Sequence, residues 1–403
     1  MPGSAAAQTA TADRSTLDRP IAPYLLVLGS AVLCYAALGL VLRALPGYVT
    51  HTLHSGGFSV GLAVGSPAIT GAVLRPVGGR LADKHTSKPV MVGGAVVMTA
   101  GTILAFVSSL PVLIASRLIV GAGEALMMGA GVRWLLELAG QNRRGQALGH
   151  IGLANYAGLA IGPLLAEWFG LVNASATLWI VAAALPLAGA ALAMTVGGHH
   201  VASFSASGQE KLATRDLLRL TARPGLGLLL VNVGYVAVLA FGATVLTSNR
   251  LGLAALVIPI FGVGVIVSRT ALARVPDRFG GRRTLVVAAT IEAAGLVSLA
   301  FATSVTIAVL SLVVLAIGQG LAVPALGLLA LQGIPPGAQG AAAGVFFAYF
   351  DAGVGLGGPA VGAAAGAVDA SAALAFAGAA VFLAVPAALL RAGSNGNDPG
   401  GDA

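Results

Sequence analysis

The segment that decides the fold is RPVGGRLADKHTSK at residues 75–88, together with its counterpart RTALARVPDRFGGR at residues 269–282. At a constant offset of 194 residues, the charged positions coincide as Arg75 with Arg269, Arg80 with Arg274, Asp83 with Asp277, Lys84 with Arg278, and Lys88 with Arg282. Charged residues are scarce in this chain, so chance is a weak explanation for the match. The chain therefore contains two copies of one structural unit.

Each copy lies between long apolar stretches. Of the 403 residues, 57% are hydrophobic and 9% are charged, whereas ordinary globular proteins contain about 25% charged residues. The mean hydropathy is +0.92. So few charges cannot cover a soluble body of this length, and the bare apolar surface would aggregate. The composition excludes a soluble enzyme, a nucleic-acid-binding protein and a disordered scaffold, and it indicates an integral membrane protein.

The apolar stretches predict twelve membrane spans. Each is long enough to cross about 30 Å of hydrocarbon as a helix, and lipid leaves no alternative that satisfies the backbone polar groups. The predicted spans are 21–43, 58–79, 89–109, 111–134, 146–168, 175–196, 226–248, 252–272, 284–303, 305–329, 341–366 and 370–391. We therefore predict an all-α integral membrane protein with twelve transmembrane helices in two six-helix bundles.

The segments between the spans set the domain organisation and the orientation. We expect a tail at 1–20, a first bundle at 21–196, a linker at 197–225, a second bundle at 226–391 and a tail at 392–403. Within the linker, leucines among cations predict a short helix on the inner membrane surface. Most Lys and Arg residues lie in the N-terminal tail and in every second connection. Because positive loops stay in the cytoplasm, both termini are predicted to be cytoplasmic, in a multi-pass protein of the inner (plasma) membrane.

A second register supports the duplication. Asn155 precedes Gly162-Pro163 in the fifth span, as Asp351 precedes Gly358-Pro359 in the eleventh, at an offset of 196 residues. The two halves thus share one orientation in the membrane. Parallel repeats of six helices are a transporter plan in which the substrate site lies near mid-membrane between the halves.

These motifs resemble those of the major facilitator superfamily over essentially the whole chain. Residues 79–88 match that family's loop signature at Gly79, Leu81, Ala82, Asp83, Lys84 and Lys88, and depart from it at Thr86 and Ser87. The stretch 158–163 is similar to the core of the family's antiporter signature. The stretch 346–359 is similar to bacterial proton-coupled exporters labelled arabinose-efflux permeases. The resemblance implies alternating access driven by a proton gradient.

Ionisable residues deep in a membrane are costly and are therefore functional candidates. Four stand out as candidates for proton coupling: Asp351, Glu124, Arg117 and Glu292. Asp351 is the first choice, because proton uptake removes the cost of burying a carboxylate in a low-dielectric medium. A structural hydrogen bond or salt bridge between helices is the alternative. The resemblance links Arg117 to proton transfer.

Three further sets of residues complete the predicted site. Contacts between the charged loops would hold the inner side closed, and this gating set is Gly79, Arg80, Asp83, Lys84, Lys88, Arg274, Asp277, Arg278 and Arg282. Aromatic and polar residues suited to an amphipathic ligand form the cavity set: Tyr35, Asn155, Tyr156, Asn232, Tyr235, Gln319, Phe346, Phe347 and Tyr349. Helix bends are expected at Gly158, Gly162, Pro163, Gly358 and Pro359.

Other signals are weak. His51 and His54 are predicted on the opposite side of the membrane from His199 and His200, so no metal site is expected. No phosphate-binding loop indicates ATP drive, and no enzyme activity, cofactor, nucleic acid or oligomer is expected. The leading hypothesis is proton-coupled export of a small, amphipathic or drug-like organic compound. The alternatives are uptake or facilitated transport of a sugar or other metabolite, and a non-transporting receptor or assembly subunit.

Overall fold

The computed structural model describes residues 21–139, 143–171, 176–197, 213–335 and 338–389, apart from a few side chains within the helices. In these ranges, twelve helical segments are long and apolar enough to cross a membrane. No strand occurs in the described ranges. The prediction of an all-α, twelve-span membrane protein is confirmed.

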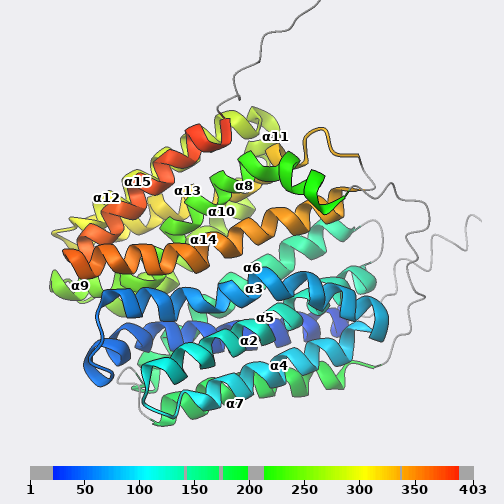
Figure 1. The fold of residues 1–403 in the computed structure, drawn as a ribbon, viewed down its shortest axis with the longest axis horizontal. Helices are drawn as coiled ribbons and strands as arrows, with labels where there is room; N and C mark the ends of the chain where they lie inside the picture. The colour runs from blue at the N-terminus through cyan, green and yellow to red at the C-terminus, as the bar shows by residue number, and fades with distance from the viewer. Residues whose placement is uncertain (1–20, 140–142, 172–175, 198–212, 336–337, 390–403) are drawn as a thin grey trace, which may run out of the picture.

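The helices divide into two sets of six spans (Figure 1). The first set is α2 (Ile21–Gly47) with the π-helical turn η1 (Tyr48–Thr52), α3 (Gly57–His85), α4 (Ser87–Leu104), α5 (Leu110–Ala139), α6 (Arg144–Trp168) and α7 (Ala176–Thr195). The second set is α8 (Thr214–Ala237) continued by η3 (Val238–Gly242) and α9 (Ala243–Ser248), η4 (Ala254–Leu256) with α10 (Val257–Ala271), α12 (Gly281–Ala300), α13 (Val305–Leu331), α14 (Gln339–Ala367) and α15 (Ala370–Leu389). The short α11 (Val275–Phe279) joins α10 to α12.

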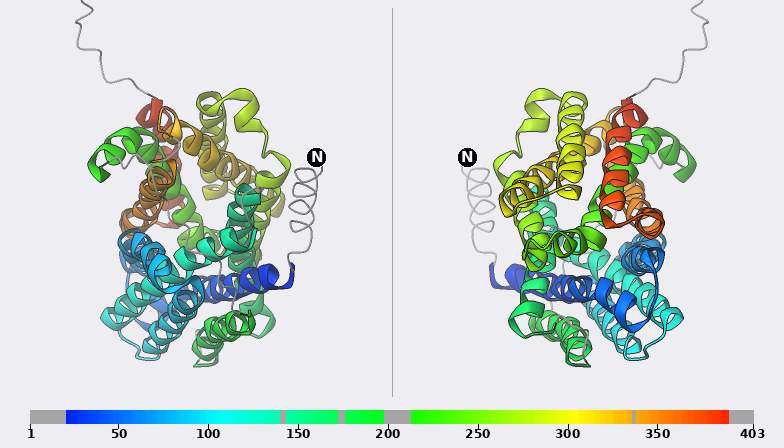
Figure 2. Two further views of the ribbon diagram at one scale, coloured as in Figure 1. Left: turned by 90° about the vertical axis from the view of Figure 1, so that its right-hand side faces the viewer. Right: turned by 90° about the vertical axis from the view of Figure 1, so that its left-hand side faces the viewer.

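The same packing pattern occurs in both sets, which form two bundles in the views of Figure 2. Helix α2 packs on α6 and α7, as α8 packs on α14 and α15. Helix α4 packs on α5 and α7, as α12 packs on α13 and α15. The principal contacts between the bundles are α3 with α14 and α6 with α10. These two contacts are equivalent under the repeat, because each joins a second helix of one bundle to a fifth helix of the other.

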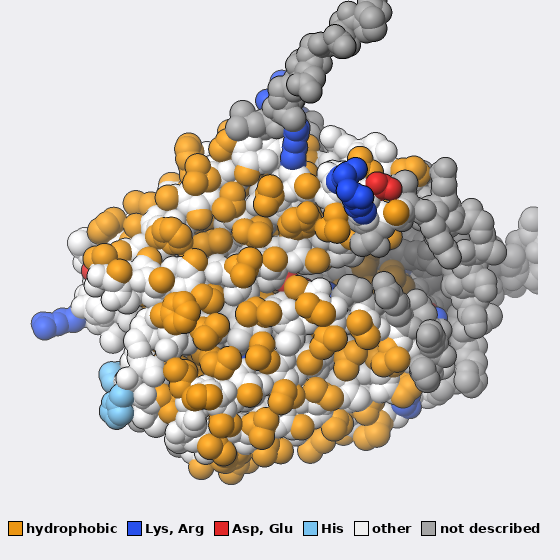
Figure 3. Space-filling view, in the orientation of Figure 1, with side chains coloured by type: hydrophobic (Ala, Val, Ile, Leu, Met, Phe, Trp, Pro, Cys, Tyr) orange, Lys and Arg blue, Asp and Glu red, His pale blue; other side chains and the backbone are white. Residues whose placement is uncertain are grey.

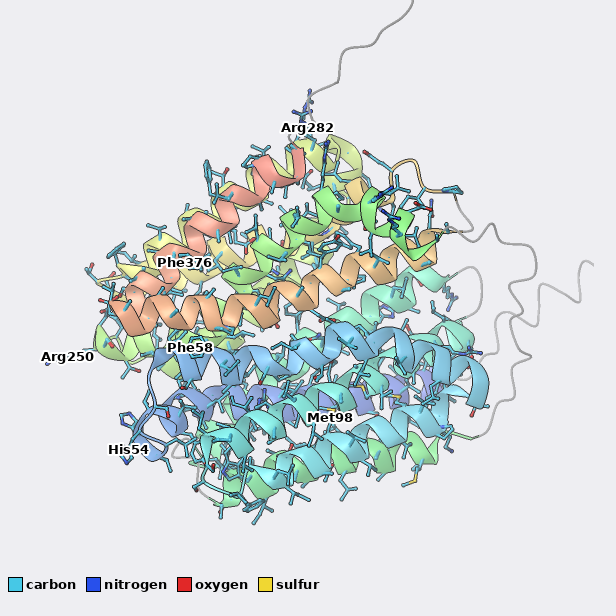
Figure 4. All side chains as sticks on the ribbon, in the orientation of Figure 1. His54, Phe58, Met98, Arg250, Arg282 and Phe376 are labelled. Carbon is cyan, nitrogen blue, oxygen red and sulfur yellow. The ribbon has the colours of Figure 1, made fainter. Side chains whose placement is uncertain are left out.

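The apolar core joins the bundles at one end only. We call the two ends of the molecule the His54 end, where His54 and Arg250 project, and the opposite end (Figure 4). Towards the His54 end, one core cluster combines Leu45 and Tyr48 with Val238 and Phe241 of the second bundle. Towards the opposite end, the first bundle has a separate core of its own, which includes residues of the early part of α2. The helices of the two bundles accordingly diverge away from the His54 end (Figure 1).

The outer surface of the bundles is apolar. Large side chains such as Phe382 and Phe376 are 56% and 46% exposed. Hydrophobic side chains are spread over the whole face in Figure 3, with charged groups mostly near its edges. This surface is what a lipid environment requires of transmembrane helices, since the tails solvate apolar groups and charged groups are costly there.

The structure moves two boundaries from their predicted positions. Helix α3 continues to His85, so most of the predicted loop 80–88 is helical, and Thr86 separates it from α4 with φ 91° and ψ 149°. The repeat-equivalent Gly280 has φ 82° and ψ 149°. This left-handed backbone is favoured only by glycine. The duplicated connection has thus kept its geometry where Thr86 stands in place of glycine.

The second shift concerns the seventh span. Helix α8 begins at Thr214, inside the segment 197–225 that was predicted as a linker, and the short surface helix expected there forms its first turns. Figure 2 shows these first turns splayed away from the bundle. Pro224 lies inside α8, where the missing backbone N–H favours a bend. Residues 198–212 lie outside the described ranges.

Candidate functional site

Glycines bring α3 and α14 into backbone contact. Gly61 and Gly65 of α3 lie against Gly358 of α14. A Cβ atom placed on Gly65 would lie 2.8 Å from the carbonyl oxygen of Val354, which leaves no room for a side chain. Small residues allow helices to approach this closely in a membrane. The contact presses α14 against α3 on the His54 side of Asp351.

Arg75 of α3 links three helices at this contact. Its Nη2 atom lies 2.9 Å from Oδ1 of Asp351 on α14 and 3.4 Å from Oε2 of Glu124 on α5. The ion pair with Asp351 crosses between the bundles, whereas the pair with Glu124 stays within the first bundle. The Asp351 side chain is 3% exposed and that of Arg75 is 25% exposed. One guanidinium therefore serves two carboxylates at the boundary of the two bundles.

Tyr35 of α2 fixes the second carboxylate. Its hydroxyl donates a hydrogen bond to Oε1 of Glu124 at 2.7 Å. The buried Oδ2 atom of Asp351, in contrast, has no hydrogen-bond partner among the described residues. We call Tyr35, Arg75, Glu124 and Asp351 the charge cluster. It holds Glu124 by two contacts and leaves one oxygen of Asp351 without a described hydrogen-bond partner.

The equivalent contact between α6 and α10 has a different chemistry. Arg269 of α10, the repeat partner of Arg75, places its Cζ atom 4.9 Å from the ring centroid of Tyr156 on α6. Its Nη2 atom lies 3.5 Å from the Tyr156 hydroxyl, which is long for a hydrogen bond. Asn155 stands where the other contact has Asp351, and its Oδ1 atom is buried without a described partner. A cation–π contact thus replaces the ion pair.

An aromatic group lies between these two contacts. The ring centroid of Tyr235 on α8 lies 6.4 Å from that of Tyr156, 5.9 Å from that of Phe261 and 5.9 Å from that of Phe350. Phe350 directly precedes Asp351 in α14. Four helices from both bundles therefore contribute to one aromatic group. The predicted cavity residues Tyr156 and Tyr235 are brought together here, and Tyr35 belongs to the charge cluster.

Arg117 and Glu124 do not form a pair. The Nε atom of Arg117 donates to the carbonyl oxygen of Ala63 on α3 at 3.3 Å, and Arg117 is 4% exposed. Of these two predicted candidates on α5, only Glu124 reaches the charge cluster.

Glu292 lies inside the second bundle. It is fully buried, and neither carboxylate oxygen has a hydrogen-bond partner in the described ranges. Its neighbours include Gly234 of α8 and Gly318 of α13, where added Cβ atoms would meet the Glu292 side chain. No basic residue of the described chain forms an ion pair with it. The structure therefore gives Glu292 no link to the charge cluster.

The remaining predicted cavity residues lie in α8, α13 and α14. Asn232 is buried and donates to the carbonyl oxygen of Leu228 at 2.8 Å. Gln319 is fully buried, and neither amide atom has a described partner. Phe346 and Phe347 contact each other at 5.7 Å between centroids, and Tyr349 lies against Gly225 of α8. The structure does not bring these residues to the charge cluster.

The predicted gating residues are only partly described. The side chains of Gly79, Arg80, Asp83 and Lys84 lie outside the described parts of the structure. Lys88 donates to the carbonyl oxygens of Met194 and Val196, each at 2.7 Å, so it ties α4 to the end of α7 within the first bundle. Arg274, Asp277, Arg278 and Arg282 are exposed. No ion pair joins these four to a described residue of the first bundle.

The predicted bend residues lie at close helix contacts. Gly158 and Gly162 of α6 pack against the backbone of α2. Gly358 packs against α3, as described above. Pro163 and Pro359 lie inside α6 and α14, and both helices continue through them.

A cleft opens at the His54 end between the bundles. Its volume is about 460 Å³, and its lining includes Arg43, Thr50, His51 and Thr247. An ion pair of 2.6 Å joins Arg43 to Glu167. The cleft is separated from the charge cluster by the contact of α3 with α14.

Arg75 and Arg269 are not among the functional candidates predicted from the sequence. Both were used only as matched charges of the repeat, although the predicted spans 58–79 and 252–272 contain them. The signal that identifies them is the duplication itself, since they are the first matched pair at the offset of 194 residues.

Two bundles of six transmembrane helices with a charge cluster at their boundary are typical of a membrane transport protein. A model of the Major Facilitator Superfamily matches residues 27–358, and the chain belongs to that superfamily, as its motifs predicted. It is therefore a secondary transporter and not an enzyme.

Relatives and solved structures agree with this membership. The chain is 28% identical over 338 residues to an uncharacterized MFS-type transporter of Salmonella typhimurium, covering 81% of this chain and 86% of the relative. It is also 28% identical to an uncharacterized MFS-type transporter of Burkholderia pseudomallei, covering 84% of each. These bacterial relatives imply the inner membrane.

Among solved structures, a mutant of the nucleoside transporter NupG matches with a TM-score of 0.77 at 17% identity, covering 90% of this chain and 98% of that one. The human organic anion transporter MFSD10 matches with a TM-score of 0.68 at 16% identity, covering 91% and 99%. At such identities the likeness shows the fold alone.

Proposed function

We propose that this chain exports a small amphipathic organic compound in exchange for protons, and that Asp351 binds the proton. The observation that carries the proposal is the ion pair of Arg75 with Asp351, which crosses between the bundles at 2.9 Å and joins a partly exposed guanidinium to a buried carboxylate. A buried carboxylate is costly to maintain. The pair lies at the boundary where the two bundles would move relative to each other. It can therefore respond to that movement, which a structural pair within one bundle could not do.

Proton binding would change the tie between the bundles. When Asp351 is ionised, Arg75 holds α14 against α3. When Asp351 takes a proton, Arg75 keeps its contact with Glu124, which Tyr35 already fixes at 2.7 Å. The pair between the bundles is then lost while the pair within the first bundle remains. A proton thus biases one of two arrangements of the bundles, which is what coupling requires.

The orientation follows from the charged connections. With both termini in the cytoplasm, the His54 end faces outward, and this conformation is closed outward by the α3–α14 contact. The bundles 21–196 and 226–391 would rock as units, and the loop residues Asp83 and Asp277 would close the inner side in the opposite state. A single chain contains all these parts, so we propose a monomer.

The direction of transport rests on the fifth span. The element 158–163 is similar to an antiporter signature, and its Gly158 and Gly162 form the close contact of α6 with α2. Antiport with inward-moving protons is export. The proposed substrate class is an amphipathic organic compound.

Flux in proteoliposomes tests the proposal. Purified protein would be reconstituted with an imposed pH gradient and offered a panel of dyes, antibiotics and sugars. We expect substrate to accumulate in acidic-lumen vesicles in exchange for protons. Asp351→Asn should abolish gradient-driven accumulation and retain substrate-for-substrate exchange. Asp369→Asn is the matched control, because Asp369 is exposed and only accepts a hydrogen bond from the backbone of Ala372.

The outcomes separate the alternatives. Unchanged proton-driven accumulation in Asp351→Asn would remove Asp351 from the mechanism. Accumulation in the direction of the proton flow would indicate uptake. No flux of any panel member in the wild-type vesicles would favour a receptor or assembly subunit.

A further inference from the structure

Arg269 is a cation at the boundary of the bundles that lacks an acidic partner. No carboxylate in the described ranges lies within ion-pair distance of its guanidinium. Its repeat partner Arg75 has two such partners, at 2.9 and 3.4 Å. The neutral Asn155 occupies the position that corresponds to Asp351. The duplication has thus retained the cation in the second contact without the carboxylate that would neutralise it.

Most donors of this guanidinium are unused. A guanidinium carries five N–H groups and no acceptor. The single described contact that engages an N–H group is the 3.5 Å approach of Nη2 to the Tyr156 hydroxyl. The Nε atom is buried and has no hydrogen-bond partner among the described residues. A buried donor without a partner costs free energy, and a ligand that accepts from it would recover that cost.

The surroundings of Arg269 favour an aromatic ligand. The Tyr156 ring lies under the guanidinium at 4.9 Å and orients it. Tyr235 and Phe350 extend the aromatic surface towards the charge cluster. Asn155 adds a buried Oδ1 atom on the same helix as Tyr156, without a described partner. The site therefore combines a cation without a described acidic partner and aromatic rings.

We propose that Arg269 binds the anionic group of the transported compound, and that the substrate is an aromatic organic anion. A carboxylate or sulfonate accepts two N–H groups of a guanidinium in parallel. The aromatic part of the substrate packs on Tyr156 and Tyr235. The claim that the bound anion is the transported substrate rests on the proposed function. The claim that Arg269 binds an anion rests on the geometry of Arg269 alone.

Binding of matched probes to the full-length protein in detergent tests the site. The probes are tritiated 2-naphthoate and two competitors of the same shape, 2-naphthamide and 2-naphthylmethylammonium. We expect 2-naphthoate to bind and both competitors to be at least about 10-fold weaker. Arg269→Gln should weaken naphthoate binding about 10- to 100-fold, as expected for a lost charged hydrogen bond. The naphthoate affinity of Arg269→Lys should lie between those of the wild type and Arg269→Gln, since an ammonium keeps the charge but cannot donate two parallel N–H groups.

Arg250→Gln is the matched control, because Arg250 is exposed at the His54 end, and thermal unfolding of each variant checks its fold. Three results would overturn the inference: no naphthoate binding to the wild-type protein, equal competition by the amide, or wild-type binding by a folded Arg269→Gln. Asp351→Asn should still bind naphthoate. If naphthoate binds but no proton moves, the proposed function fails and the anion site stands.

Discussion

The two contacts between the bundles are equivalent in the repeat and differ in chemistry. Where α3 meets α14, glycines let the backbones touch and Arg75 pairs with Asp351. Where α6 meets α10, Arg269 lies over the Tyr156 ring. The arginine is common to both contacts, and its partner is not.

The difference shows how two copies of one contact can acquire separate roles in a duplicated protein. A symmetric pair of ion pairs would give two coupling sites and leave no free cation for a ligand. With Asn155 at one contact, a carboxylate remains on one side and a guanidinium without a described acidic partner on the other. In the proposed mechanism, proton and substrate act at opposite contacts of the same boundary, and both bias the same motion.

Removal of each arginine gives the largest expected contrast. Arg75→Gln leaves Asp351 and Glu124 without their cation, and we expect a loss of up to about 3 kcal/mol in the free energy of unfolding. Arg269→Gln removes no ion pair, and we expect a change within about 1 kcal/mol. Thermal unfolding in detergent measures both.

The double variant Arg75→Gln with Asp351→Asn should recover part of the stability lost in Arg75→Gln. If Arg75→Gln and Arg269→Gln destabilised the protein equally, the α3–α14 contact would not differ from the α6–α10 contact in depending on an ion pair.

Glycine substitutions test how tightly the helices pack at the two contacts. A Cβ atom on Gly61 would meet the carbonyl oxygen of Gly358, whereas one on Gly262 of α10 would lie 3.2 Å from the Cβ atom of Ala160. Gly61→Ala should therefore push α3 from α14 and open the His54 end, and Gly262→Ala should do so far less. A cysteine at Thr247, in the cleft, would report opening by its rate of reaction with a membrane-impermeant maleimide.

We expect a several-fold faster reaction in Gly61→Ala. The native Cys34 is buried and leaves the background low. Gly93→Ala is the control, because no atom lies within 4 Å of its added Cβ. The same rate in all three glycine variants would mean that the α3–α14 contact does not close this end.

Tyr35→Phe tests whether Glu124 is held in place for the charged contact. The change removes the 2.7 Å hydrogen bond to Glu124, which is worth about 1.5–3 kcal/mol for a charged acceptor. We expect proton-driven transport to fall several-fold, because Glu124 would then compete less well with Asp351 for Arg75. Tyr24→Phe is the matched control, since the Tyr24 hydroxyl contacts only exposed His150 at 2.8 Å. Equal transport in both variants would be evidence against a positioning role.

Glu292→Gln should have the smallest effect. The residue lies in neither contact, and both of its oxygens are buried without described partners. A neutral amide of the same shape should leave transport within about twofold and stability equal or higher, because an unpaired buried acid is replaced. Transport assays and thermal unfolding check this. Loss of proton coupling in a folded Glu292→Gln would bring Glu292 into the mechanism.

Much of the fold could be predicted from the sequence because lipid imposes strict rules on length and composition. Twelve apolar runs predict twelve spans whatever their neighbours, and the matched charges predict two like bundles. Asp351 and Glu124 were identifiable as candidates because ionisable groups are rare inside a membrane.

The partners of those acids were not predictable in the same way. Arg75 and Asp351 are 276 positions apart, and their pairing depends on which helix faces meet across the boundary. Arg75 lies near the end of the predicted span 58–79 and was read only as a matched charge of the repeat, whereas α3 continues to His85. Arg117 and Glu124 share one helix, yet Arg117 is held by the backbone of α3, which no spacing along α5 reveals.

The turn at Thr86 has a mechanical consequence. A single residue with a glycine-like angle is all that joins α3 to α4, and Lys88 fastens the start of α4 to the end of α7. Because this one-residue connection is so short, a tilt of α3 is expected to move α4, and the Lys88 hydrogen bonds extend the movement to α7. A displacement at one side of the first bundle is thereby transmitted to its other side.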